Sequence, residues 1–406
     1  MTRVSVAWRC DASIAACRSS GRCSLNRRFA DNPRWRTKLL LALVLGATLR
    51  GASAWSQSSH VLREALCTAC LSIVPALTLG EDTGLGTLGG GRGLVQLRDG
   101  SFVHSDGRGG VLVKLSSAGV PLQRIGREGS GPLEFRRIDW LMRDGSDSLL
   151  VFDLENGRAV TISPSGRQSR QFQMAYPVTS ASFLPNGNIV ANVHFADSRL
   201  TRMPVHVLDR RSGAVLASFG HESNRVYDAR EAWAGWRELT VDPTGTIWTV
   251  RRNDYRLEAW DARGKRLQSL ERRVSWFPPY TVRARLSPQD APQPHVERVH
   301  ADSFGRLWVF IAVPAQDWRK HIVERAATPG ILPGYEPVSL SGIYDTIVEV
   351  IDIRSATVLA SRRIADYGWG MVSDSLMYSD AQAADGVPRY RLWKVGFAGG
   401  STSGRR

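Results

Sequence analysis

Lysine is scarce in this chain, which has only five lysines against 48 arginines among its 406 residues. The formal net charge of +15 at pH 7 would suit an anionic polymer. However, the first 54 residues hold ten basic residues and only two acidic ones, so they account for about half of the excess. The remaining charge is spread thinly, without the clustered patch that nucleic-acid binding requires. We therefore predict no nucleic-acid partner and interpret the arginine excess as a coding bias.

The chain also lacks an apolar run long enough to span a bilayer as a permanent helix. Its one distinct run, Leu39 to Leu49, follows three basic residues at positions 34–38 and precedes the small residues Ala52-Ser53-Ala54. This order is typical of a secretory signal peptide. We expect residues 34–54 to be that signal, with cleavage after Ala54. The mature protein is then exported to the periplasm, the envelope or the medium, without a membrane span.

Residues 1–33 are polar and arginine-rich and have no hydrophobic periodicity, so we interpret them as a non-native or disordered extension before the true start. Cys10, Cys17 and Cys23 in that stretch match no strong zinc pattern. The remaining cysteines, Cys67 and Cys70, form a Cys-x-x-Cys pair within a short segment, 55–71. In an exported protein we expect these two to form a local disulfide, with two free thiols as the alternative.

Tight turns that end in glycine recur along the rest of the chain and indicate an internal repeat. The first turn of each repeat lies at 98–100, 143–145, 185–187, 243–245 and 303–305, and the second turn lies at 117–119, 164–166, 211–213 and 262–264. Apolar stretches rich in β-branched and aromatic residues lie between these turns, as strands require. No helical pattern of convincing length follows the signal peptide.

These repeats predict an all-β fold, a six-bladed β-propeller over residues 72–397, with seven blades as the alternative. The expected blades cover 92–126, 138–172, 178–220, 236–271, 298–364 and 369–397. The last blade lacks a fourth strand, and Val74 to Leu79 is left over before the first blade. We expect this N-terminal strand to close the ring, because closure hides the sheet edges. Residues 398–406 are expected to be a disordered tail, and the protein to be a monomer.

The second repeat resembles the NHL-type six-bladed propeller family. Residues 129–135 follow the family's Gly-x-Gly-Pro-Gly-Glu-Phe linker except at Leu133, and Asp153, Asn156 and Arg158 follow its Asp-x-x-Asn-x-Arg pattern. The resemblance is sharp over 122–172 and holds in outline over 74–397. It implies a kinship with exported bacterial propellers, most of which have no known function. We interpret the three polar residues as supports of the architecture, because their side chains can hydrogen-bond nearby backbone.

No motif of a hydrolase, kinase or dinucleotide-binding enzyme is present in the sequence. We identify no catalytic or metal-binding residues, and the cofactor is unknown. The favoured function is therefore a non-catalytic propeller that binds a protein or a small molecule. The alternative is a metal-dependent hydrolase or lyase with its site in the channel.

A long insertion at about 314–342 interrupts the fifth repeat and is rich in proline and glycine. Long irregular loops are usually functional or disordered, and the sequence is compatible with both alternatives here. Aromatic and basic residues dominate binding hot spots. The candidate binding residues of the insertion are Trp318, Arg319, Lys320, His321 and Tyr335.

Overall fold

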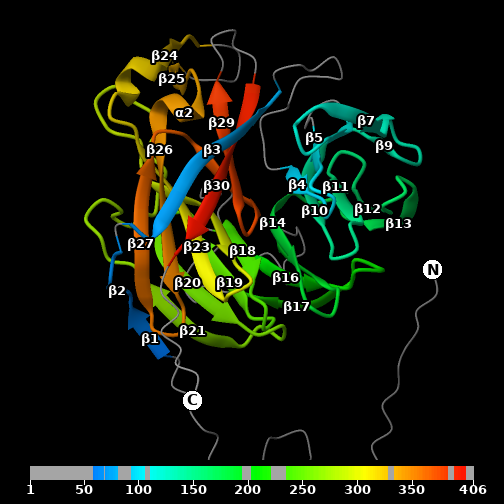
Figure 1. Ribbon diagram of the computed structural model, residues 1–406, viewed down its shortest axis with the longest axis horizontal. Helices are drawn as coiled ribbons and strands as arrows, with labels where there is room; N and C mark the ends of the chain where they lie inside the picture. The colour runs from blue at the N-terminus through cyan, green and yellow to red at the C-terminus, as the bar shows by residue number, and fades with distance from the viewer. Residues whose placement is uncertain are drawn as a thin grey trace, which may run out of the picture. The chain divides into compact units, whose positions relative to one another are not determined.

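The computed structural model describes residues 58–67, 69–80, 93–105, 110–193, 203–220, 235–327, 333–382 and 388–398. Within these ranges the chain is nearly all-β, and its strands form six blades of a β-propeller (Figure 1). The predicted fold is thus confirmed. None of the helices in these ranges is long and apolar enough to cross a membrane. The expected signal peptide and the extension before it lie outside the described residues.

Each blade is built on four antiparallel strands. These strands follow one another in the chain except in blade five, which an insertion interrupts, and in the last blade. Blade one contains β4 (Leu94–Gln96), β5 (Phe102–Ser105), β6 (Leu112–Leu115) and β7 (Pro121–Ile125). Blade two contains β10 (Ile138–Arg143), β11 (Leu149–Asp153), β12 (Arg158–Ile162) and β13 (Gln168–Gln173). Blade three contains β14 (Val178–Phe183), β15 (Ile189–Val193), β16 (Val205–Leu208) and β17 (Val215–Phe219).

The second half of the chain repeats this arrangement with longer strands. Blade four contains β18 (Arg237–Val241), β19 (Ile247–Arg251), β20 (Asp254–Trp260) and β21 (Arg266–Glu271). Blade five contains β22 (His295–Ala301), β23 (Arg306–Pro314), β26 (Tyr344–Asp352) and β27 (Thr357–Ile364). Blade six contains β28 (Gly368–Ser373), β29 (Leu376–Gln382), β30 (Pro388–Phe397) and β3 (Leu71–Leu79). A short parallel pair, β8 (Arg127–Glu128) and β9 (Glu134–Phe135), lies in the linker before blade two.

The ring closes through β3, which pairs antiparallel with β30 as the outermost strand of blade six. In Figure 1, β3 (blue) lies beside β30 (red), although about 300 residues separate them in the chain. This confirms the predicted closure by an N-terminal strand. The two ends of the domain are thereby joined by backbone hydrogen bonds.

The residues before β3 add two strands that the sequence did not predict. The strand β1 (Ser58–Val61) pairs parallel with β21 on the outer edge of blade four, and β2 (Arg63–Glu64) pairs parallel with β27 on that of blade five. Both blades therefore have five strands. The chain thus follows the outer edges of blades four, five and six in turn, and we call residues 58–67 the N-terminal strap.

Connections differ in length between the two faces of the ring. The first-to-second and third-to-fourth strand turns lie on one face and are short, as the repeated glycine turns predicted. The other connections lie on the opposite face, and they include 272–294 and 315–343. We call these the turn face and the loop face.

Six apolar clusters form the core: five lie between two neighbouring blades, and one joins blades five, six and one. Trp248 packs between blades four and five, Trp260 between three and four, and Trp308 between five and six. Their rings are at least 92% buried.

The family-like linker motif also has the structural role that was expected. Asp153 accepts hydrogen bonds from the backbone N–H groups of Arg136 and Arg137 and from the amide of Asn156. Arg158 donates to the carbonyl oxygens of Gly131 and Glu134. These contacts hold the linker between blades one and two.

Candidate functional site

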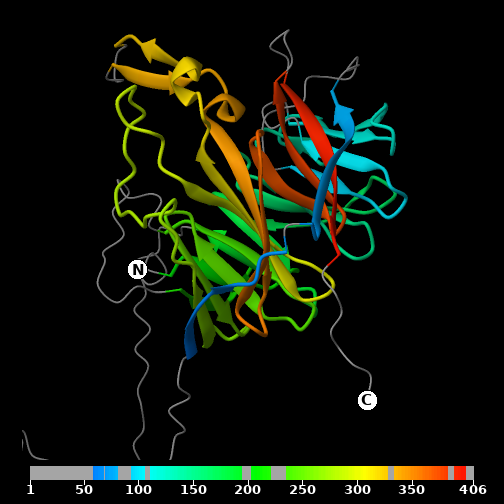
Figure 2. The same cartoon turned by 60° about the vertical axis from the view of Figure 1, so that its left-hand side comes forward.

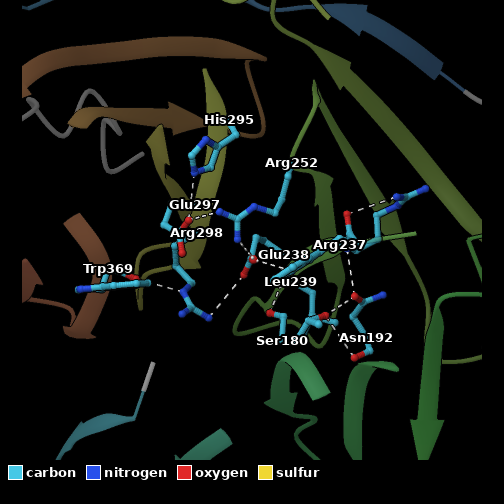
Figure 3. Close-up of polar contacts among 12 residues, drawn as sticks. Ser180, Asn192, Arg237, Glu238, Leu239, Arg252, His295, Glu297, Arg298 and Trp369 are labelled. Atoms are coloured by element: carbon cyan, nitrogen blue, oxygen red, sulfur yellow. Dashed lines mark hydrogen bonds and ion pairs between the residues drawn. The ribbon is translucent and has the colours of Figure 1, made fainter. Parts of the chain in front are cut away.

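A buried network of charged residues lies where the inner strands of blades four and five meet (Figure 3). Glu238 on β18 and Glu297 on β22 are both fully buried. Arg252, which directly follows β19, lies between them: its guanidinium binds Glu297 and is 3.5 Å from Glu238. Burial of two carboxylates is tolerated here because a guanidinium compensates both charges.

Three further residues complete this network. The hydroxyl of Tyr367 donates to Glu297 over 2.6 Å and is 3.3 Å from Nε2 of His295. Burial, aided by the charge of Arg252, lowers the pKa of His295 to about 4, so its ring is neutral at pH 7. Arg298 is 3.5 Å from Glu238 and donates to the carbonyl oxygen of Trp369, as Figure 3 shows. The network is thus balanced in charge and stiffly held.

The central channel beside this network holds a cavity of about 250 Å³. The guanidinium of Arg298 lies 4.6 Å from the ring centroid of Trp140 in the channel wall. Within the described ranges, no group of three or more His, Cys, Asp or Glu side chains could hold a metal ion. The charges of Arg252 and Arg298 are paired with those of Glu238 and Glu297. We therefore interpret the network as a support for the inner strands of blades four and five.

A larger cleft of about 690 Å³ lies on the loop face. Its walls are the segment 280–293, which connects blades four and five, and the insertion of blade five (Figure 2). The insertion is not an irregular loop: it contains a 3₁₀ turn, η3 (Trp318–His321), a hairpin of β24 (Ile322–Arg325) and β25 (Gly334–Pro337), and a short helix, α2 (Leu340–Ile343). We call this hollow the loop-face cleft.

The chemistry of the loop-face cleft combines tyrosines, arginines and apolar side chains. Its lining includes Tyr280, Tyr335, Tyr344, Arg283, Arg285, Arg325, Glu336, Gln293, Leu286, Pro292, Pro337, Leu340 and Ile343. A cleft of this size suits a small organic molecule. Most of its walls come from the connections at 272–294 and 315–343.

Tyr344 links this cleft to the buried network. Its ring packs edge-on against His295, with the two centroids 5.0 Å apart. Burial raises the pKa of both Tyr344 and Tyr280, the latter well above its usual range. Both phenols are therefore protonated at neutral pH and can donate a hydrogen bond.

The walls of the cleft are fixed by side chain to backbone hydrogen bonds. Gln293 accepts from the backbone N–H of Ala284 over 2.7 Å and donates to the carbonyl oxygen of Val282. Arg319 of the insertion donates to the carbonyl oxygen of Pro288 over 3.0 Å, which joins the two walls. The cleft is therefore held open before any ligand arrives, which lowers the cost of binding.

The residues predicted from the insertion have different roles. Trp318 is 97% buried in the cluster that joins blades five, six and one, so it offers no contact surface. Arg319 covers that ring and joins the walls, whereas Lys320 and His321 lie near Asp317. Of the five candidates, only Tyr335 lines the cleft.

Sequence reasoning missed the opposite wall of the cleft, including Tyr280, Arg283 and Arg285. A signal was present, because residues 278–294 combine five prolines with two arginines in a connection longer than its counterparts. At the start of the domain, the structure joins Cys67 to Cys70 by a disulfide, with the Cα atoms 5.4 Å apart. This pair lies between β2 and β3, far along the chain from the cleft residues.

No family model matches this sequence, and no curated protein matches it either. Among solved structures, it is similar to a member of the DUF4221 family from Bacteroides vulgatus, with a TM-score of 0.55, 11% identity, and coverage of 81% of this chain and 99% of that chain. A putative exported protein from Bacteroides fragilis matches with a TM-score of 0.53, 10% identity, and coverage of 84% and 99%. A virginiamycin B lyase from Staphylococcus aureus follows, with a TM-score of 0.45, 9% identity, and coverage of 79% and 99%. At these identities the likeness concerns the fold alone.

Proposed function

We propose that this protein is an exported, non-catalytic propeller that binds a ligand in the loop-face cleft. The proposed export rests on the signal-like residues 34–54 and accords with the disulfide at Cys67. We also propose that the protein acts as a monomer and belongs to the wider NHL-type group, which the linker motif supports.

One observation carries this proposal. The two long connections at 272–294 and 315–343 meet on the loop face and enclose an ordered cleft. Function on rigid scaffolds is concentrated in such connections, because loops vary while the strands keep their positions.

A variant that fills the cleft tests the proposal. Ala291 is exposed on the cleft wall, so Ala291→Trp should occupy the space with little effect on folding. Ala262 is exposed in a turn on the opposite face, so Ala262→Trp is the matched control. In a thermal-shift screen of small molecules, stabilising compounds should lose their effect with Ala291→Trp and keep it with Ala262→Trp. Compounds that stabilise all three proteins equally would contradict the proposal.

A channel-centred enzyme is the second candidate function, and the juxtaposition of His295, Glu297 and Tyr367 favours it. Side chains of these three types can transfer protons in acid–base catalysis, but Glu297 is already bound to the guanidinium of Arg252. Metal analysis of the purified protein separates the two candidates. One zinc or calcium per chain, lost on replacing His295, would favour the enzyme over the binding protein.

A further inference from the structure

The loop-face cleft has an excess of positive charge. Three arginines line it, at positions 283, 285 and 325, against one carboxylate, Glu336. Arg325 is 3.8 Å from Glu336, so this pair is partly neutralised. Arg285 is exposed, and the described part of the chain places no carboxylate within ion-pair distance of it. Arg285 therefore presents to the cleft a positive charge that no described carboxylate compensates.

Two phenol groups add neutral donors close to this charge. Tyr280 and Tyr344 line the cleft together with Arg283. Each of these groups donates hydrogen bonds, and a guanidinium matches the planar geometry of a carboxylate. These residues thus suit an oxyanion.

Apolar side chains also line the cleft. They include Leu340 and Ile343 of α2 together with Pro292 and Pro337. Ile343 is buried and packs into the cluster that joins blades five, six and one. A ligand that fills the cleft would therefore contact both basic and apolar groups.

An extended peptide fits this cleft less well than a small molecule. Within the described residues of this hairpin, β25 has one edge that is not paired with β24, and a peptide strand could add there. The N–H of Val338 donates to His321, so alternation along the pair turns the N–H of Tyr335 outward. Pro333 and Pro337 flank it and have no N–H, and such prolines blunt an edge against strand addition.

We propose that the loop-face cleft binds a small organic anion, whose oxyanion lies at Arg283 and Arg285 and whose apolar body packs on Leu340 and Ile343. This inference rests on the proposed binding function and specifies its ligand class. The shared chemistry is an oxyanion on an apolar body, so the anion can be a carboxylate or a phosphate.

Calorimetric titration with matched probes tests the inference. Phenylbutyrate and phenyl phosphate carry the anion on an apolar body, whereas phenylbutyramide is the neutral match for the first. We expect at least one anion to bind more tightly than the amide. Arg285→Gln should weaken that anion about tenfold, the effect of losing one charge-assisted contact. Arg263→Gln, an exposed arginine on the turn face, is the control and should leave the affinity unchanged.

Three results would overturn the inference. These are equal binding of the amide, absence of binding by both anions at millimolar concentration, and binding only of an acetylated tetra-aspartate peptide. Preference for phenyl phosphate over phenylbutyrate would support the anion site and identify the phosphate as its group. If Ala291→Trp abolishes binding of neutral compounds instead, the ligand class is wrong but the binding function stands. If no compound of any class is sensitive to Ala291→Trp, the binding function itself fails.

Discussion

Single aspartates position much of this propeller. Asp242 and Asp302 each accept backbone N–H groups two and four residues later, and each also accepts the indole N–H of the tryptophan six residues later. The sequence shows these as Asp-x-x-Gly-x-x-Trp. The carboxylate thus fixes the turn and the ring of the following strand together, which explains why the pattern recurs in neighbouring blades.

We expect Asp153→Ala to lower the free energy of unfolding by about 2–4 kcal/mol, because it leaves the N–H groups of Arg136 and Arg137 without their buried acceptor. Asp317 is half-exposed, so Asp317→Ala should cost less than about 1 kcal/mol. Urea unfolding of both variants measures the difference. Equal losses would mean that the linker contacts do not hold blade two in place.

Buried histidines should make the protein sensitive to acid. Burial lowers the pKa of His104 to about 4, below its usual 6.5. Between pH 4 and pH 6.5, the ring is therefore protonated in the unfolded chain and neutral in the folded chain. Stability contributed by the neutral ring is complete above pH 6.5 and is lost as pH falls toward 4, on the order of 3 kcal/mol. His104→Phe should therefore flatten the fall in unfolding free energy over this window. A wild-type slope in the variant would show that His104 is not buried as described.

At the level of elements, the strap and the insertion depart most from a minimal blade. Glu64 of β2 binds Arg272 over 2.5 Å, and Arg272 also binds the buried Glu349 over 2.9 Å. The strap thus reaches a charged group inside the blade five sheet. The hydroxyl of Tyr255 donates to Glu349 as well.

Removing Arg272 should be costly, because Glu349 would remain buried without a counter-charge. We expect Arg272→Met to lower the free energy of unfolding by about 3–5 kcal/mol. Glu64 is half-exposed, and Glu64→Gln should cost under about 1 kcal/mol. Adding Glu349→Gln to Arg272→Met should recover part of the loss in chemical denaturation. A double variant as unstable as the sum of its parts would argue against this pairing.

The insertion should be part of the core rather than an appendage. Trp318 is buried in the cluster that joins blades five, six and one, so Trp318→Ala should lower the free energy of unfolding by about 3–5 kcal/mol, whereas Lys320→Ala on the exposed side should lower it little. Differential scanning calorimetry of the two variants measures this. Replacing the whole insertion with a Gly-Ser turn should likewise lower the melting temperature. An unchanged melting temperature would show that the insertion does not contribute to the stability of the core.

Element boundaries followed from the sequence where local chemistry determines them. Glycine turns and β-branched runs located the blades. The turn at Gly145 is an exception, because the residue with positive φ there is Asp147, at 64°, and not the glycine. The strap escaped prediction because its pairing partners lie about 200 to 300 residues away. The cleft escaped it because Tyr280 and Tyr335 are brought together only by the packing of two separate connections.

In the whole domain, the two faces of the ring differ in the length of their connections. The turn face repeats short, carboxylate-fixed turns, whereas the loop face holds the long connections and the cleft. The ring was predictable from its repeats, since each blade needs a neighbour to bury its apolar surface. The ligand was not, because no repeat encodes the insertion that forms its site.

The most direct test of the central claim is a crystal structure of the protein with the strongest stabilising compound from the screen. We expect the compound to lie in the loop-face cleft, in contact with both Arg283 and Tyr335. A compound bound only in the central channel beside Arg298, or only on the turn face, would contradict it.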